Sequence, residues 1–557
     1  MKLVSLLTFI LLYTPSVYSQ DELLNILSDE LDREWEVLKQ AEEPAYYISY
    51  RVEDQYTATI GASLGSIVQH NDNKVRLGQV DIRVGDYTKD NTREVNSLYG
   101  FNSYGSYGSH NLPIDNEKKA IQQALWKATH DKYNQAVKAF RLVDSQDDDK
   151  KEVSDFSKEK SNEYFEDHSL VVPNMDGWDK KLKRLSSLFT ENPYILNGNV
   201  NISSSANRSY LVDTEGTKVV RNKYRTQLTI SADIVTEDDE VIPFHKTYNV
   251  KFPEDLPSFE SLTDDIEGMM RTLDQLRVAP LAEPFTGPAL LHPRAAGVFF
   301  HEIFGHRIEG HRLKSDTDGQ TFKEKVGTKV LPEFVNIYSD PTRKDYDGKY
   351  LNGYYRYDDE GIASRKVEVV KNGILKTFLM SRSPLEKVKN SNGHGRSNIG
   401  LKPVARQSNL IIEANETYDH QELRSLLIKE CEKQGKEYGY YFVDVEGGFT
   451  RTDRYATNAF NILPILVYRI YIDERPDELV RGVDLIGTPL AMFAEIMAMS
   501  NETEVFNGIC GAESGNVPVS AVSPGLFVRR IETQKKPIEK QKDILPILER
   551  PKTSQTN

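Results

Sequence analysis

The spacing of apolar residues along the chain has two periods, and each predicts one kind of secondary structure. Apolar side chains at helical spacing occur in four segments of the first half, which are 21–43, 116–141, 178–190 and 256–277. Residues 46–86 and 210–250 alternate instead between apolar and polar side chains, as half-buried strands do. The first half of the chain is therefore expected to combine strands with amphipathic helices.

The second half has a different order of elements. The fourth helix ends at Ala279-Pro280, because proline cannot continue a helix, and this is the best candidate for a domain boundary. A strand then precedes a helix that starts near Pro293 and is expected to end at Gly310. Mostly strands and long loops follow as far as Glu532.

The length of 557 residues predicts roughly two to four domains. We assign an N-terminal domain to 20–278 and a C-terminal domain to 279–532. Within the first, the charged connector at 144–160 is expected to be a solvated surface segment. The Lys/Glu/Pro-rich tail at 533–557 is expected to be disordered.

Composition narrows the classes of function. The formal net charge is −14, and no cluster of Lys and Arg outweighs its acidic surroundings, which argues against a nucleic-acid partner. The 29 Tyr and 22 Phe residues favour a strand-rich protein with large aromatic side chains in its core.

The first nineteen residues resemble a secretory signal peptide. Lys2 precedes an apolar run from Leu3 to Tyr13, and small or modest residues follow at 17–19. This run is well short of the roughly twenty apolar residues that span a bilayer, so an uncleaved anchor is the weaker alternative. We expect residues 1–19 to be removed, no membrane-spanning segment in the mature chain, and an exported protein, in the periplasm or secreted.

The stretch His301-Glu302-Ile303-Phe304-Gly305-His306 carries the chemistry. In the common zinc-peptidase signature the two His are four residues apart on a helix, and the Glu after the first His acts as general base. Here the spacing is five, which places the two side chains about 140° apart on a regular helix. A π-bulge, given backbone freedom by Gly305, would bring both imidazoles to one metal ion.

A third metal ligand is needed beyond the two His. Candidates nearby are Glu309 and His311, although both are expected to be ordinary surface groups at the end of the helix. A distant candidate is Cys510, in a Gly-rich loop that is expected to lead into a strand. Cys431 is the other cysteine, and in an oxidising compartment a Cys431–Cys510 disulfide is the alternative to metal binding.

Together these motifs resemble the TldD/PmbA family of metallopeptidases, in its TldD-like catalytic branch, here as an exported variant. The His-Glu-x-x-x-His helix is followed some two hundred residues later by Cys510-Gly511 and Val517-Pro518-Val519. Five intermediate landmarks occur in the expected order, at 309–310, 357–361, 371–375, 392–396 and 445–448.

The resemblance implies that His301, His306 and Cys510 bind Zn²⁺, with water as the fourth ligand, and that Glu302 is the general base. Three protein ligands and one open position are the arrangement of catalytic zinc. It also implies an α+β fold, with an N-terminal α/β domain and a mainly antiparallel β C-terminal domain that carries the metal helix.

The function that follows is a zinc-dependent peptidase that hydrolyses unfolded or short peptides through a metal-activated water. The family forms dimers, so a homodimer or a heterodimer with a family member is expected. Two alternatives remain: a non-catalytic secreted partner subunit, or a metal-dependent hydrolase of another amide or ester. The loop residues Asn392, Gly393 and Arg396 are candidates for substrate contacts or an ordinary Gly-rich turn, and His394 is expected to be exposed.

Overall fold

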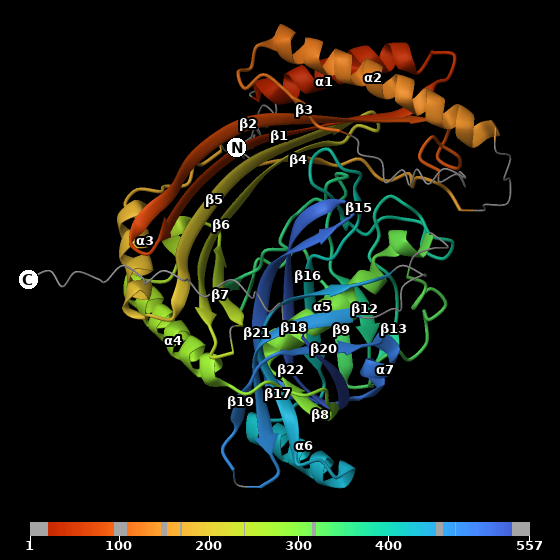
Figure 1. The fold of residues 1–557 in the computed structure, drawn as a ribbon. Coiled ribbons are helices and arrows are strands. Elements are labelled where there is room, and N and C mark those ends of the chain that lie inside the picture. Colours follow the sequence, from red (N-terminus) through yellow and green to blue (C-terminus); the bar gives the residue numbers. More distant parts are fainter. Residues whose placement is uncertain are drawn as a thin grey trace, which may run out of the picture.

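The computed structural model describes residues 21–93, 108–145, 153–166, 170–238, 240–314, 319–452, 460–473 and 475–536. Its described strands form two large sheets, one built before residue 251 and one after residue 285. The first sheet arches over the second, and helices lie on its outer side (Figure 1). The signal peptide predicted at 1–19 lies outside the described residues.

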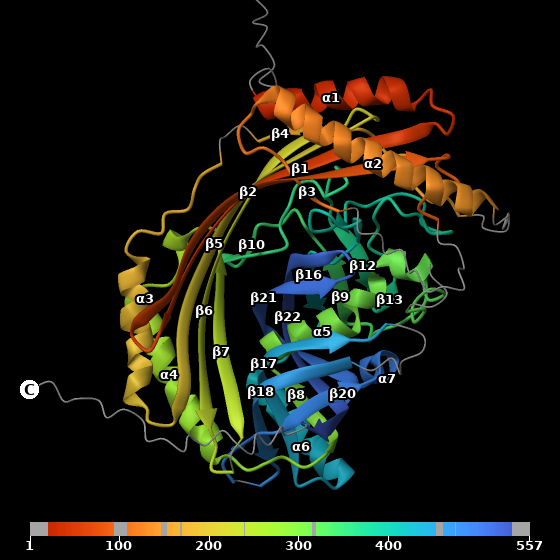
Figure 2. The same cartoon turned by 45° about the horizontal axis from the view of Figure 1, so that its top comes forward.

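The N-terminal sheet is built from unusually long antiparallel strands. Its order is β3-β2-β1-β5-β6-β4, with β7 paired to β6, and only β4 runs parallel to its neighbour. The strands are β1 (Ala45–Ser63), β2 (Ser66–Val84), β3 (His110–Asn111), β4 (Glu163–Phe165), β5 (Ile195–Asp213), β6 (Lys218–Val235) and β7 (Val241–Val250). Turning the view shows the same curved layer wrapping one side of the molecule (Figure 2).

Four helices cover one face of this sheet. They are α1 (Glu22–Leu38), α2 (Lys118–Ser145), α3 (Trp178–Ser187) and α4 (Phe259–Val278). Side chains alternate between the faces of a strand, so Val52 and Ile60 of β1 pack beneath the helices in two apolar clusters. Thr59 of the same strand points to the other face, where it donates a hydrogen bond to Ser203 of β5 over 3.2 Å. The uncovered face is therefore polar.

The C-terminal sheet is mixed. Its order is β13-β12-β9-β16-β22-β20-β18-β17-β8, with β19 paired to β18 and β21 to β22. Most pairs are antiparallel, but β16 runs parallel to β22, and β17 parallel to β8. The strands are β8 (Thr286–Leu291), β9 (Val335–Ser339), β12 (Val367–Lys371), β13 (Ile374–Leu375), β16 (Asn409–Ala414), β17 (Tyr438–Thr450), β18 (Phe460–Tyr471), β19 (Glu478–Val480), β20 (Val483–Gly487), β21 (Ile496–Ala512) and β22 (Gly515–Lys535).

Three helices accompany this sheet: α5 (Pro293–Ile303), α6 (His420–Gln434) and α7 (Pro489–Ala494). Leu291 of β8 packs in the cluster that contains the apolar side of α5, while its neighbour Leu290 packs against α6. Helices α5 and α6 therefore lie on opposite faces of the sheet. Four two-residue strands, β10 (Asp345–Tyr346), β11 (Lys349–Tyr350), β14 (Gly395–Arg396) and β15 (Val404–Ala405), form two small ribbons. The α+β class is confirmed.

Buried polar contacts join the two sheets. Arg51 of β1 donates to the Ser397 hydroxyl over 2.9 Å, and Arg221 of β6 forms an ion pair with Asp359. Arg382 lies 2.8 Å from Glu215, in the turn between β5 and β6. The polar face of the arch is thus held against loops of the C-terminal half by hydrogen bonds and ion pairs. Among the described residues, no helix has the length and apolar content to cross a bilayer.

Two boundary predictions need correction. Within the connector predicted at 144–160, Phe156 is only 3% exposed, because the guanidinium groups of Arg83 and Arg382 stack on its ring. At the other end, β22 continues to Lys535, and Thr533 is buried with its backbone N–H bonded to the Phe285 carbonyl. Residues 533–535 of the predicted tail are therefore ordered, because they pair with a neighbouring strand. Residues 537–557 lie outside the described part.

The apolar side of α4 provides a stability test. Leu273 is fully buried between α4 and the N-terminal sheet, whereas Val278, at the end of the same helix, is 58% exposed. We expect Leu273→Ala to lower the free energy of unfolding by about 2–5 kcal/mol in urea titrations, because it leaves a cavity. Val278→Ala should change it by less than about 0.5 kcal/mol. Equal effects of the two variants would contradict the packing described for this face.

Candidate metal centre

The helix that carries His301 is wrapped in apolar side chains. Pro293 occupies the first turn of α5, where its missing N–H costs no hydrogen bond, and the helix packs against β17, β21 and β22. Phe299 and Phe300 are fully buried. His301 and Glu302 lie in the last turn, so the end of a rigid, buried helix fixes their backbone positions.

The five-residue spacing is accommodated by ending the helix, and the π-bulge predicted from sequence is wrong. The α-helix stops at Ile303, and Gly305–Ile308 forms a 3-10 turn, η4. This change of direction lets His306 face His301, with ring centroids 5.0 Å apart. Gly305 is required for space, because a Cβ at this position would lie 1.8 Å from Oε1 of Gln407.

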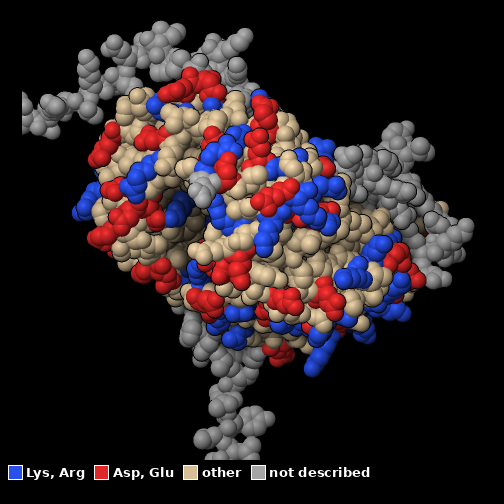
Figure 3. All heavy atoms as spheres, turned by 90° about the horizontal axis from the view of Figure 1, so that it is seen from below, with Lys and Arg blue, Asp and Glu red and all other residues tan. Residues whose placement is uncertain are grey.

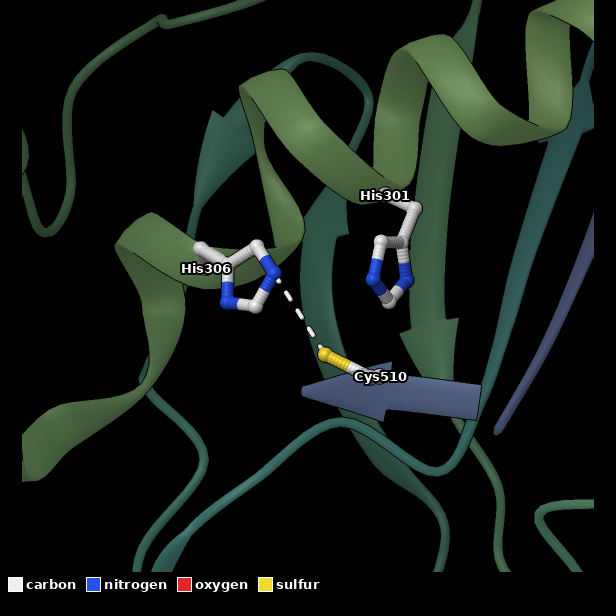
Figure 4. Close-up of side chains that lie close together, drawn as sticks. All are labelled: His301, His306 and Cys510. Carbon is white, nitrogen blue, oxygen red and sulfur yellow. Dashed lines mark hydrogen bonds between the residues drawn. The ribbon is translucent and has the colours of Figure 1, made fainter. Parts of the chain in front are cut away.

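Cys510 completes a cluster of three ligands. It lies within β21, two residues before the strand ends, so its assignment to a loop is corrected. Its Sγ is 3.4 Å from Nε2 of His306, and the ligand atoms of His301, His306 and Cys510 all lie within 4.8 Å of one another. Figure 4 shows the imidazoles of His301 and His306 on the two sides of the thiol. The structure thus brings together all three residues predicted as ligands.

The alternative disulfide does not form. Both cysteines are free, and Cys431 is buried in α6 among residues of a different apolar cluster from the one around Cys510. Burial raises the pKa of the Cys431 thiol to about 12. Cys431 is therefore a small apolar core residue.

The donor set fits zinc. Zinc bonds of about 2.3 Å to sulfur and about 2.0 Å to nitrogen in a tetrahedron place the two donor atoms about 3.5 Å apart. The observed separation of Cys510 Sγ and His306 Nε2 is 3.4 Å. Two imidazoles and one thiolate are also ligands that zinc prefers, and three protein ligands leave one position open.

The cluster is electrostatically matched to hold a thiolate. Burial by itself would raise the pKa of Cys510, but the neighbouring His306 and His301 outweigh it and hold that pKa well below the usual value. Burial likewise opposes a charged His306, yet Cys510 and Glu309 raise its pKa well above the usual value. The site is therefore ready to take a cation in place of these protons.

Glu302 lies next to the ligand cluster. One carboxylate oxygen is 4.0 Å from Nε2 of His306, and the side chain is nearly buried. A Cβ on Gly448 of β17 would come within 2.7 Å of Glu302 Cγ, so this glycine makes room for the carboxylate. The Glu302 carboxylate thus lies beside one of the three ligand atoms, Nε2 of His306, and is not itself part of the ligand cluster.

Two residues expected at the surface are in fact internal. Glu309 is fully buried, and its carboxylate lies 3.1 Å from Nδ1 of His306 and accepts from Arg312 over 2.9 Å. Nε2 of His311 is hydrogen-bonded to the carboxylate of Glu513, in the turn between β21 and β22. The chain continues inward after η4 as a second 3-10 segment, η5 (Gly310–Lys314), and this buries both side chains.

The loop at 392–396 is hydrogen-bonded to the backbone of several neighbouring segments. Asn392 accepts from the Met380 N–H and donates to the Phe378 carbonyl, both over 2.8 Å, so both ends of its amide are engaged by backbone. Gly393 has φ +78° and no room for a side chain. Arg396 donates to the carbonyls of Gln407 and Pro518. The predicted substrate contacts of these residues remain a prediction.

His394 is completely buried, contrary to the exposed position expected for it. Its Nε2 lies 3.0 Å from the Ser339 hydroxyl, and burial lowers its pKa to about 3. It is therefore a neutral packing residue between the loop and β9.

Comparison with known proteins agrees with this geometry. Residues 285–535 match the family model of the PmbA/TldA metallopeptidase C-terminal domain. A protein named Metalloprotease from Archaeoglobus fulgidus is 34% identical over 235 residues, which are 42% of this chain and 50% of that protein. The C-terminal domain belongs to the TldD/PmbA metalloprotease family.

A further relative is named as a zinc enzyme. The zinc metalloprotease TldD homolog of Saccharolobus solfataricus is 26% identical over 251 residues, 44% of this chain and 51% of that protein. The chain spans about half the length of these two curated relatives.

Solved structures extend the likeness of fold to the N-terminal arch. A Thermotoga maritima protein described as a modulator of DNA gyrase superposes with a TM-score of 0.61 at 16% identity, over 91% of this chain and 99% of that one. TldE from Thermococcus kodakarensis gives 0.60 at 13% identity, over 92% and 100%. The TldD-like fold thus includes both sheets.

The two cysteines should differ in reactivity in the metal-free protein. The lowered pKa of Cys510 favours its thiolate, which is the reactive form, while the raised pKa of Cys431 keeps that thiol protonated. We expect iodoacetamide to modify Cys510 and to spare Cys431, as read by peptide mass spectrometry. Prior addition of zinc should protect Cys510. Preferential labelling of Cys431, or labelling of Cys510 that zinc leaves unchanged, would contradict this assignment.

Proposed function

We propose that this protein is a zinc-dependent peptidase whose metal is held by His301, His306 and Cys510. The observation that carries the proposal is the convergence of three donor atoms within 4.8 Å beside a buried carboxylate. The metallopeptidase family of the C-terminal domain gives independent support. A zinc ion with one open position would supply a polarised carbonyl and a water of lowered pKa.

Glu302 is the residue that moves a proton in this scheme. Its carboxylate stands 4.0 Å from His306 Nε2, which is within reach of a water placed between them. It would accept a proton from the attacking water and deliver it to the leaving amine. Gly448 leaves room for the side chain and the buried helix α5 fixes its backbone, which favours a carboxylate already placed to act.

Short or unfolded peptides are the proposed substrates. The ligand cluster is almost fully buried, and the arch of the N-terminal sheet curves around this half of the molecule (Figure 2), which disfavours folded proteins. The polar face of the arch bears neutral side chains, including Thr59, Ser203 and Thr229, which can bond to a peptide backbone whatever its sequence. Seen from below, the surface is hollowed, with acidic and basic groups interspersed around the hollow (Figure 3).

Two further expectations belong to the same proposal. A dimer, of like chains or with another family member, would enclose the site, as the resemblance implies. Export rests on the signal-like sequence of 1–19. Both are testable by light scattering of the mature chain and by N-terminal sequencing of protein isolated from its host.

Replacing the proposed general base should separate chemistry from metal binding. We expect Glu302→Gln to lower kcat for cleavage of unstructured peptides about 10²–10⁴-fold, because general-base catalysis contributes about this much. The zinc content of the variant should stay near one ion per chain, since Glu302 is not among the three ligands. Metal analysis and mass-spectrometric peptide assays on the same preparation measure both quantities.

Glycine variants in β17 give a matched control. Gly448→Ala would press on Glu302 Cγ, whereas a Cβ on Gly447 meets nothing within 4 Å. Cleavage should therefore fall in the first variant and persist in the second. Full activity of Glu302→Gln with zinc bound would refute the proposed role of Glu302, and activity that survives chelation of all metal would refute the proposed function.

A further inference from the structure

Two fully buried side chains of opposite charge close a ring with two of the three ligands. Glu309 lies against Nδ1 of His306, and Arg406 lies against the sulfur of Cys510. Nε of Arg406 is 3.4 Å from Oε1 of Glu309, which joins the two. Burying an ion pair completely is costly, so a pair retained at this position calls for a specific use.

The Glu309 carboxylate fixes the orientation of His306. It is 3.1 Å from Nδ1, and accepting the Nδ1–H leaves the lone pair of Nε2 directed toward Cys510, 3.4 Å away. Glu309 is held in turn by Arg312 Nε over 2.9 Å and by the backbone N–H of Gln407 over 3.3 Å. The carboxylate therefore has little freedom to turn away from the imidazole.

Arg406 holds Cys510 through both the sulfur and the backbone. One terminal nitrogen lies 3.1 Å from Cys510 Sγ and donates to the Cys510 carbonyl over 2.8 Å. The other donates to the Ser514 hydroxyl over 2.8 Å and to the Gly515 carbonyl over 3.1 Å. A planar fork is needed to reach both strands of the β21–β22 hairpin at once, and only arginine offers one.

A hydrogen bond to a thiolate also changes its donor strength. The donated proton stabilises the sulfur lone pairs, so the sulfur gives less charge to a bound metal. Because Glu309 and Arg406 carry opposite charges, together they add no net charge to the site. Each residue therefore acts on one ligand. Glu309 orients an imidazole, and Arg406 positions a thiolate and lowers its strength as an electron donor.

We infer that Glu309 and Arg406 are positioning residues that set the affinity and the electrophilic strength of the metal centre. Glu309 acts through the His306 ring, and Arg406 acts through the Cys510 sulfur and the hairpin that carries it. This inference rests on the proposed metal site, but it assigns to each residue an effect that the three ligands alone do not predict.

Cobalt(II) is the probe, because a thiolate bound to cobalt gives a near-ultraviolet sulfur-to-metal charge-transfer band. Transferring an electron from sulfur costs more when Arg406 stabilises its lone pairs. We therefore expect Arg406→Met to move the band to longer wavelength and to weaken cobalt and zinc binding about 10–100-fold. Glu309→Gln should weaken binding similarly but leave the band in place, since its sulfur keeps Arg406.

Arg312 provides the matched control. It donates to the same Glu309 carboxylate over 2.9 Å, and its terminal nitrogens donate to Glu513 and Thr452, whereas Arg406 is the arginine that contacts the Cys510 sulfur. Arg312→Met should therefore keep the wavelength of the wild-type band. Because Arg406 also ties the hairpin together, Arg406→Lys is measured beside Arg406→Met, with circular dichroism as the check on folding. The lysine variant keeps the charge without the fork, and its band should shift part of the way.

The outcomes distinguish a failure of this inference from a failure of the proposed function. A band that stays at the wild-type wavelength in the folded Arg406 variants would overturn the inference and leave the metal site intact. The same holds if Arg406→Met does not fold and the band of Arg406→Lys is unmoved, or if Arg312→Met shifts the band as far as Arg406→Met. A wild-type protein that binds no cobalt through sulfur would overturn the proposed function itself.

Discussion

The thiol of Cys510, placed in a water-poor position between two imidazoles, is the group on which the arrangement of the site depends. Burial alone would keep it protonated, and the charges around it reverse that preference. Two elements from opposite ends of the C-terminal half must therefore be placed accurately relative to each other. The end of α5 brings His301, and the β21–β22 hairpin brings Cys510.

Strand β22 makes that meeting possible. It pairs with β21, β16, β20 and β8, so it connects the hairpin of Cys510 to the strand that leads into α5. A Cβ added at Gly297 of the same helix would lie 3.4 Å from Ala521 of β22, so the strand and the helix approach each other closely. The rigidity of the centre is thus a property of the sheet, and the N-terminal arch adds enclosure through polar contacts such as the Arg221–Asp359 pair.

Much of the fold could be predicted from sequence because its elements are long and strongly periodic. The helices α1, α2 and α4 and the strands β1, β2, β6 and β7 follow directly from their apolar spacing. Local signals failed where tertiary contacts decide. Phe156 sits in a charged segment but is buried by two arginines, and the periodic signal over 293–310 does not reveal that the helix ends at Ile303.

The same distinction holds for the site. His301, Glu302, His306 and Cys510 are recognisable because their residue types and order are distinctive. The sequence indicates for Glu309 only a metal ligand or a surface group, and for Arg406 only a charged residue ahead of an apolar strand. Their roles depend on complete burial and on partners about one hundred residues apart, which no local pattern encodes.

X-ray absorption spectroscopy of the zinc-loaded protein tests the central claim most directly, because it reports the atoms bound to the metal. The account predicts one sulfur at about 2.3 Å and two imidazole nitrogens at about 2.0–2.1 Å, with one light atom in the remaining position. The sulfur shell should disappear in Cys510→Ser and persist in Cys431→Ser. A zinc ion surrounded only by nitrogen and oxygen in the wild-type protein would contradict the account.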